Sequence, residues 1–214
     1  MHALIAGATG ATGKDLLEQL LNDEAFEKVD IFVRRDPGIR HEKLKINIID
    51  FDDPENWKHL ITGDVLFSAI GTTLKAAGSK AAQWKIDHDY QYQFAKTAKE
   101  NNVHTFVLVS SAMATPTARF FYPRMKGQLE SAVTKLEFPK LIILRPPTLE
   151  RKKSDRPMER VAVRLLRFFN RIGLLKSQQP MDTALLATAM RAMVKQLQNG
   201  CYVFEAVQIR NWVK

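Results

Sequence analysis

Short apolar runs alternate with helical patterns from residue 2 to residue 145. Strands are predicted at 2–6, 29–33, 44–50, 64–70, 105–111 and 141–145, and helices at 13–22, 54–60, 83–100 and 122–136. Short strands separated by helices are typical of a parallel sheet that is covered on both faces. Right-handed crossovers then give an α/β fold of the Rossmann type, a doubly wound parallel sheet with helices on both faces.

The chain changes character after Arg145. The segment 145–160 is rich in charge and proline and is predicted to be a loop, followed by helices at 158–172 and 181–198 and a short strand at 201–204. These pieces are too small for an independent domain, so residues 1–214 are predicted to form one domain. Residues 146–214 are expected to form a small cap, or substrate region, over the carboxyl ends of the strands, where ligands bind in such sheets.

Composition narrows the setting and the partners. The single cysteine, Cys201, excludes an internal disulfide and favours a reducing cytoplasmic location, with Cys201 as a small core residue. Glycine interrupts the first apolar run, so we expect no signal peptide, and no uncharged apolar stretch of about 18 residues predicts a membrane span. The net charge of +9 suits anionic partners such as nucleotides. No nucleic-acid recognition module accompanies that charge, so we expect no direct nucleic-acid binding.

Three glycines follow the first predicted strand at a spacing of three, in the stretch GATGATG. Between a strand and a helix, such glycines let the backbone approach a pyrophosphate at the helix N-terminus. The spacing is GxxGxxG, which differs from the GxGxxG of many dehydrogenases. A dinucleotide site at Gly7, Gly10 and Gly13 is therefore predicted, and the alternative is a glycine-rich turn with no ligand.

The end of the second predicted strand bears on the choice of dinucleotide. An acidic residue there would hold the ribose 2′-hydroxyl of NAD, but the sequence has Arg34 and Arg35, with Asp36 after them. Arginine suits a 2′-phosphate, so NADP(H) is favoured over NAD(H). The alternative is a pair of surface arginines. Asp50, with Phe51, ends the third strand and is expected either at the adenine edge or as a cap for the next helix.

A serine, a tyrosine and a lysine follow the fifth predicted strand. Ser111 ends that strand, and Tyr122 and Lys126 are four apart, on one face of the next helix. A carbonyl that accepts hydride needs a proton, and an ammonium group lowers the tyrosine pKa from about 10. Ser111 would hydrogen-bond the developing oxyanion. The alternative is that Tyr122 packs, Lys126 is solvated and the serines cap a turn.

These motifs carry a family resemblance. GATGATG, SAIGTT, LVSS and YPRMK, in this order, resemble the extended or atypical branch of the short-chain dehydrogenase/reductase superfamily, and most of all its Tat-interacting-protein group of small NADPH-binding reductases. The resemblance runs from Ala3 to about Phe169 and implies a Rossmann fold with Ser111, Tyr122 and Lys126 as the catalytic triad. The expected cofactor-binding residues are Gly7, Thr9, Gly10, Ala11, Thr12, Gly13, Arg34, Arg35, Asp50, Phe51, Ala69, Ile70, Gly71, Thr72, Ser110, Lys126, Arg145 and Pro146.

The resemblance implies two kinds of function. The first is an NADPH-dependent oxidoreductase in which Tyr122 gives a proton to a small carbonyl substrate. The second is an NADP(H)-binding, redox-sensing regulator with little turnover that acts through a protein partner. A homodimer is expected on resemblance alone. One departure is Asp87, where many short-chain reductases have an asparagine, and it weakens a proton relay built on an amide.

Two other features have ordinary explanations. The helix at 158–172 has an apolar face beside a stripe of arginines, which fits an anionic membrane or an acidic partner. We expect instead that its apolar face packs on the domain while the arginines remain in water, so no membrane partner is predicted. His88 and His104 lack the spacing of a zinc or iron site, and no catalytic metal is predicted.

Overall fold

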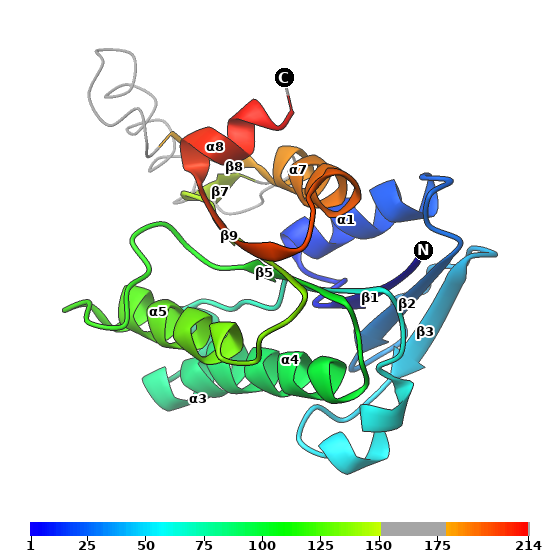
Figure 1. Ribbon diagram of the computed structural model, residues 1–214. Helices are drawn as coiled ribbons and strands as arrows, with labels where there is room; N and C mark the ends of the chain where they lie inside the picture. The colour runs from blue at the N-terminus through cyan, green and yellow to red at the C-terminus, as the bar shows by residue number, and fades with distance from the viewer. Residues whose placement is uncertain (151–178, 214) are drawn as a thin grey trace.

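The computed structural model describes residues 1–150 and 179–213, and its centre is a seven-stranded sheet in which all paired strands run parallel. Across the sheet the strands are β3 (Leu44–Ile48), β2 (Lys28–Val33), β1 (His2–Ala6), β4 (Val65–Ser68), β5 (Thr105–Val109), β6 (Lys140–Arg145) and β9 (Gly200–Glu205). Figure 1 shows helices on both faces of this sheet. The predicted α/β Rossmann fold is therefore confirmed.

Each face of the sheet has its own hydrophobic core. Ala3 and Ile5 of β1 face the core under α1 (Ala11–Leu21) and α7 (Thr183–Gln196). Leu4 and Ala6 face the core under α4 (Tyr90–Glu100) and α5 (Phe121–Thr134). Because successive side chains point to opposite faces and both faces are covered, most positions of the central strands are apolar. This explains why continuous apolar runs located the strands.

The boundaries of several helices differ from the predicted ones. The predicted helix at 83–100 is three elements: α3 (Lys80–Trp84), a π-helical turn (Lys85–Asp89) and α4. The predicted helix at 54–60 is two short 3₁₀ turns, Pro54–Asn56 and Lys58–Leu60. Two short helices, α2 (Leu74–Ala77) and α8 (Ala206–Asn211), were not predicted because they are too short to show a hydrophobic period.

The described part of the C-terminal region joins the main layers. The helix α7 packs on α1, where Arg191 and Lys195 both contact the Asp23 carboxylate, at 2.9 and 2.7 Å. The strand β9 pairs with β6, and β7 (Leu149–Glu150) pairs with β8 (Met181–Asp182) in a separate small sheet. Residues 183–205 thus extend the Rossmann layers. Of the region expected to form a cap, 146–214, residues 151–178 lie outside the described residues, and they include the whole predicted basic helix at 158–172.

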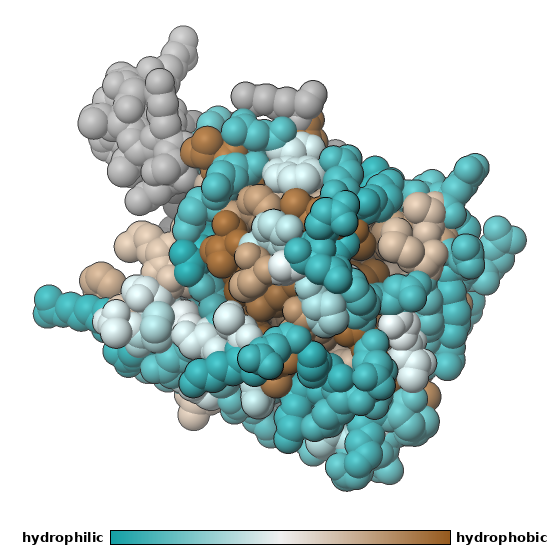
Figure 2. Space-filling model, in the orientation of Figure 1, coloured by the Kyte–Doolittle hydropathy of each residue, from teal (hydrophilic) through white to brown (hydrophobic). Residues whose placement is uncertain are grey.

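The strand β9 is one edge of the sheet, and only one of its faces is covered. Tyr202 and Phe204 face the helical layer, while Cys201 and Val203 are exposed. Figure 2 shows hydrophobic atoms in the middle of this side of the molecule, framed by hydrophilic ones, and Figure 1 places β9 there. The prediction that Cys201 is a core residue is therefore wrong, because an outward-facing position on an edge strand has no layer above it.

Candidate functional site

The glycine-rich turn brings two loops of the sheet edge into contact. Gly7 has a φ of +94°, and a Cβ there would lie 2.6 Å from the backbone of Ala69 and Ile70. A Cβ on Gly13 would lie 2.1 Å from the Gly7 carbonyl oxygen. Glycine is needed at both positions, since only glycine tolerates this φ and this approach. The loop after β1 therefore lies directly against the loop after β4.

The N-terminus of α1 has the properties of an anion site. Its N-cap is Gly10, and neither a capping side chain nor an acidic residue occupies its first turn. Thr9 next to it is exposed, while Ala11 and Thr12 begin the helix. The first N–H groups of a helix have no partner within it, and they favour negative charge together with the helix dipole. The turn therefore fits the pyrophosphate of a dinucleotide.

A cavity of about 640 Å³ lies beside this turn, between α1 and the segment 37–41. Its wall includes Ala8 and Thr9 of the turn, Leu17 of α1, and Ile39 of the segment. It opens on the α1 side of the sheet, so it adjoins the glycine turn and the loop after β2.

The loop after β2 carries two exposed arginines and one carboxylate that already accepts hydrogen bonds from other groups of the protein. Arg34 and Arg35 are exposed, and no other described residue forms a salt bridge or hydrogen bond with either side chain. Asp36 accepts hydrogen bonds from Arg40 at 2.7 Å and from the Gly38 amide at 2.8 Å. These contacts lower the pKa of Asp36 to about 2. The acidic group that would bind a ribose 2′-hydroxyl is thus occupied, while two guanidinium groups beside it are available.

The residues that follow β3 and β4 complete the part of the site that is predicted to bind the dinucleotide. The carboxylate of Asp50 accepts the Asp52 amide at 2.9 Å in a local turn. The N-cap of the next 3₁₀ turn is Asp53, so Asp50 does not cap that element. Phe51 packs on Tyr90, with ring centroids 5.3 Å apart. In the loop after β4, Ala69 and Ile70 are partly buried, Gly71 is exposed, and the Thr72 amide is bonded to a carboxylate from the next helical segment.

Ser110 and Arg145 make contacts that the sequence did not indicate. Ser110 donates a hydrogen bond to the buried Glu130 carboxylate, and Arg145 donates to both oxygens of the same group, with its closest contact at 2.6 Å. The Pro146 carbonyl oxygen accepts the Ala112 amide at 2.9 Å. These groups tie the ends of β5 and β6 to α5, so the structure places them in the scaffold behind the site.

The three predicted catalytic residues lie at the end of β5 and the start of α5. Among the residues that the structure describes, Ser111 donates only to the Ala112 carbonyl oxygen, at 3.3 Å, and Tyr122 is 37% exposed. Lys126 is 2% exposed, and its Nζ lies 3.4 Å from the Val109 carbonyl oxygen. The alternative in which Lys126 is a solvated surface lysine is therefore wrong.

Lys126 faces an unexpected partner. Its Nζ lies 4.0 Å from the carboxylate of Asp87, which is itself fully buried. Burial of the hydroxyl, followed by the Asp87 charge, raises the pKa of Tyr122 above its ordinary value. The expected effect of Lys126 on that pKa remains a prediction.

A buried polar column was missed by the sequence analysis. Gln83, Asp87 and Gln91 are all less than 5% exposed. They lie four residues apart, and this helical spacing is the feature of the sequence that could have revealed them. Gln83 donates to the Thr72 carbonyl oxygen at 3.3 Å, and Gln91 accepts from Ser68 at 2.8 Å. The column therefore fixes the loop after β4 against the α3–α4 segment.

Comparison with known proteins identifies the family. Residues 7–162 match the NAD(P)H-binding family. The chain is 36% identical over 208 residues to Protein FMP52-1, mitochondrial, of Scheffersomyces stipitis, covering 94% of this chain and 91% of that protein. The chain belongs to this FMP52-like, NAD(P)H-binding family. It is also 42% identical over 159 residues to Protein FMP52, mitochondrial, of Saccharomyces cerevisiae, covering 72% of this chain and 68% of that protein.

Solved structures show the same fold at low identity. An enzyme of Bordetella bronchiseptica, WbmH, in complex with NAD+, has a TM-score of 0.68 at 18% identity, covering 96% of this chain and 75% of that one. The oxidoreductase ylbE of Lactococcus lactis has a TM-score of 0.70 at 16% identity, covering 100% and 95%. Together with the family match, these structures support an NAD(P)-binding Rossmann protein of the atypical short-chain type.

The comparisons overturn one expectation. The relatives named above are called mitochondrial, so the predicted cytoplasmic location is contradicted. Among residues 1–150 and 179–213, no helix has the length and apolar character needed to cross a bilayer. The same residues contain no group of three or more side chains arranged to bind a metal ion.

Proposed function

We propose that this protein is an NADPH-dependent oxidoreductase that reduces a small carbonyl compound, with Tyr122 as the proton donor. The observation that carries the proposal is the meeting of two sites at one sheet edge. The glycine turn at Gly7 abuts the loop after β4, and that loop is bonded to the same segment that contacts Lys126. A dinucleotide along that edge would extend from α1 toward Tyr122.

The preference for NADPH rests on the loop after β2. A 2′-phosphate carries charge that Arg34 and Arg35 can neutralise, whereas Asp36 is already bonded to Arg40. With Asp36 engaged, the ribose 2′-hydroxyl of NADH would lack its usual carboxylate acceptor.

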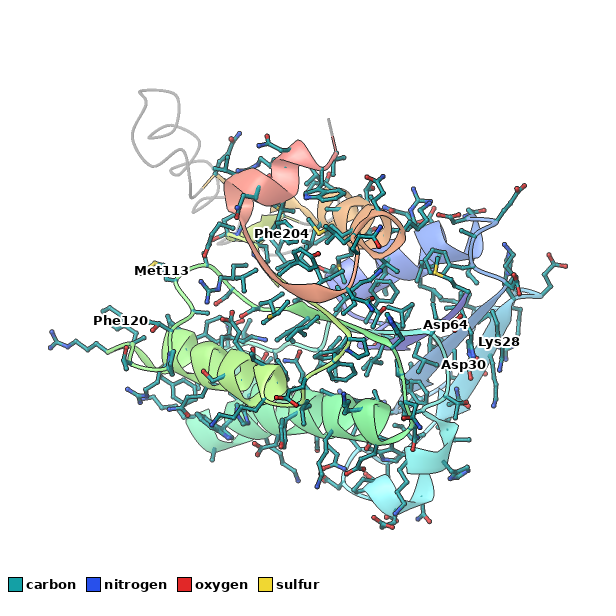
Figure 3. The ribbon with its side chains drawn as sticks, viewed as in Figure 1. Lys28, Asp30, Asp64, Met113, Phe120 and Phe204 are labelled. Atoms are coloured by element: carbon teal, nitrogen blue, oxygen red, sulfur yellow. The ribbon has the colours of Figure 1, made fainter. Side chains whose placement is uncertain are left out.

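The substrate is proposed to be apolar. Met113 and Phe120, in the loop between β5 and α5, are 66% and 69% exposed. Figure 3 shows both beside the N-terminal end of α5, next to the turn that holds Tyr122. Large apolar side chains exposed at the rim of a site favour binding of an apolar group.

Three side chains have proposed roles in the reaction. Bound NADPH would supply the hydride that the carbonyl carbon accepts. Tyr122 would donate the proton to the carbonyl oxygen, and Ser111 would hydrogen-bond that oxygen while it carries negative charge. Lys126 would supply positive charge behind Tyr122 as the proton leaves.

A regulatory role is the second candidate, because Lys126, which would activate Tyr122, faces the Asp87 carboxylate at 4.0 Å. A protein that binds NADPH as a signal would need the cofactor site without an activated tyrosine. In either role we propose a mitochondrial location, following the names of the relatives. The nearer resemblance to the Tat-interacting-protein group and the homodimer remain predictions.

The test of cofactor preference is a parallel titration with NADPH and NADH, followed by quenching of fluorescence from the three tryptophans. The wild type should bind NADPH more tightly than NADH. The double variant Arg34→Ala/Arg35→Ala should lower the affinity for NADPH about 10–100-fold and change the affinity for NADH little, because charge-assisted hydrogen bonds to the 2′-phosphate are lost. Lys96→Ala/Lys135→Ala removes the same charge from exposed positions and is the control. Equal affinity for both cofactors in the wild type would contradict the preference.

The test of turnover is a carbonyl screen with Tyr122→Phe beside the wild type. Loss of the proton donor should reduce kcat at least about 100-fold while NADPH still binds. Equal turnover in both proteins would overturn the role of Tyr122, and tight NADPH binding without turnover on any carbonyl would favour the regulatory candidate.

A further inference from the structure

The connection from β2 to β3 lacks the helix that usually joins two parallel strands. Such a connection normally packs a helix on one face of the sheet. Residues 34–43, all of which the structure describes, form a loop with no helix, although β2 and β3 pair from Val29 to Val33. The sheet beside α1 is therefore covered by a loop at this point, and the cavity of about 640 Å³ lies between that loop and α1.

This cavity extends along α1, whereas a dinucleotide would extend along the edge of the sheet. Its lining includes Lys14, near the start of the helix, and Leu21, the last helical residue. Seven residues of an α-helix span about 10 Å. A dinucleotide with its pyrophosphate at the α1 N-terminus follows the carboxyl ends of the strands. It would leave the far part of the cavity unfilled.

The interior of the cavity is apolar. Leu17 of α1 and Ile31 of β2 belong to the hydrophobic core on this face of the sheet. Pro37 and Ile39, both half-buried, form the facing wall on the loop. Small-molecule sites have volumes of roughly 300–1,000 Å³ and mainly apolar walls. The size and lining of this cavity therefore suit a ligand with an alkyl chain.

One end of the cavity carries positive charge without a partner. Lys14 is exposed, and within residues 1–150 and 179–213 its ammonium forms no salt bridge or hydrogen bond. Ala6 and Phe32 pair across β1 and β2, so Arg34 and Arg35 leave the sheet beside the turn that contains Thr9.

Glu18 and His41 also line the cavity, and Glu18 is one helical turn beyond Lys14. The carboxylate of Glu18 opposes an anion in the middle of the cavity. The part that favours an anionic head group is consequently the end at Thr9 and Lys14.

We propose that this cavity binds a medium-chain fatty acid, with its alkyl chain between α1 and the loop 34–43 and its carboxylate at Thr9 and Lys14. The Lys14 ammonium and the Thr9 hydroxyl can donate to the carboxylate, while the chain leaves water. The bound anion lies next to the site proposed for the 2′-phosphate of NADPH, and like charges repel. The fatty acid should therefore weaken NADPH binding more than NADH binding, a consequence that rests on the cofactor preference proposed above.

Calorimetric titration of the protein without cofactor tests the site. Decanoate, below its micelle concentration, should bind, and butanoate should bind at least about 10-fold more weakly because most of the apolar chain is missing. Ile39→Trp should fill the cavity and lower the decanoate affinity at least about 10-fold. Ile48→Trp is the control, since Ile48 is 60% exposed on β3 and outside the cavity lining.

A second variant of the same wall, Pro37→Trp, replaces Ile39→Trp if that protein does not fold. Absence of decanoate binding to the wild type, or an unchanged affinity in the folded wall variant, would overturn the proposal.

Lys14→Met tests the position of the carboxylate, because it keeps an apolar stem and removes the ammonium. The decanoate affinity should fall about 5–10-fold, and the affinity for decanol, which lacks the charge, should not change. Lys135→Met removes an exposed lysine at the end of α5 and is the control. Wild-type affinity for decanoate in Lys14→Met would contradict the proposed orientation.

Titrations with NADPH and NADH in the presence of saturating decanoate test the competition. The NADPH affinity should fall about 3–10-fold and the NADH affinity less, because only NADPH carries the 2′-phosphate. An equal loss for both cofactors would contradict the assigned site. Decanoate binding that depends on Ile39 and Lys14, in a protein that binds neither cofactor, would support the fatty acid site and contradict the oxidoreductase function. NADPH binding without decanoate binding would do the reverse.

Discussion

Asp30 and Asp87 are both buried carboxylates, but their surroundings differ. Asp30, on β2, is 2% exposed and lies within 4 Å of three basic side chains: His2 at 2.9 Å, Lys28 at 3.5 Å and Lys45 at 3.9 Å. Within residues 1–150 and 179–213, Asp87 has one cation within this distance, Lys126 at 4.0 Å. Figure 3 shows Lys28 and Asp30 on the side of the molecule away from Met113 and Phe120.

The difference teaches how to separate a structural charge from a functional one. The partners of Asp30 come from three adjacent strands, and the strand register fixes their positions. Both lysines there are about half exposed, so they satisfy the carboxylate and still contact water. Asp87 has no such surplus of positive charge. Burial therefore raises the pKa of Asp87, and the charge of Lys126 offsets only part of that effect.

The largest expected effect is on stability at the Asp30 cluster. Asp30→Ala should lower the free energy of unfolding by about 2–4 kcal/mol, since three basic groups then face one another around a buried space. Urea denaturation measures the loss. Lys45→Ala removes one half-exposed partner and should cost about 0.5 kcal/mol or less. If Asp30→Ala cost no more than Lys45→Ala, Asp30 would not be the structural charge in this comparison.

A smaller effect with a distinctive pH dependence is expected at Asp87. Asn keeps an acceptor for the Thr72 amide, so Asp87→Asn should change stability by no more than about 1.5 kcal/mol. Burial raises the pKa of Asp87, so the folded wild type holds a proton that the unfolded chain has lost, and stability falls as pH rises above about 4. The stability of the Asn variant relative to the wild type should therefore increase with pH.

Urea denaturation of both proteins at pH 4, 6 and 8 checks this dependence. A difference that stays constant, or changes in favour of the wild type as pH rises, would contradict the account of Asp87 as a buried and incompletely compensated charge.

The smallest effect is expected at an exposed carboxylate, Asp36. Arg40→Ala removes its main partner, and the pKa of Asp36 should rise from about 2 toward its ordinary value. The released carboxylate can then accept a ribose 2′-hydroxyl, so the preference for NADPH over NADH should fall about 2–5-fold. Parallel titrations with both cofactors measure this ratio. An increased preference would show that Asp36 does not oppose the 2′-phosphate.

Much of the fold could be predicted because the central strands are buried on both sides. The apolar run of β1 matches its predicted bounds, and the strands after it differ by only a few residues. The errors fall where burial is incomplete or local. Cys201 is apolar enough for a core, but only tertiary structure shows that β9 is an edge.

The site could be predicted only where local spacing carries the information. Gly7, Gly10 and Gly13 follow from a strand, a turn and a helix in succession, and Tyr122 and Lys126 follow from the period of one helix. The contact of Lys126 with Asp87 joins two helices far apart in the sequence. No local pattern shows which carboxylate the folded chain brings to a lysine.

The π-helical turn at Lys85–Asp89 corrects the phase of a helix. Residues four apart on an α-helix drift by about 40° at each step, so a column spaced by four would spiral away from its partner surface. The wider turn absorbs this drift and lets Gln83, Asp87 and Gln91 all reach the loop after β4 or support it. The geometry of this site therefore depends on the number of residues between Gln83 and Gln91 as much as on their identity.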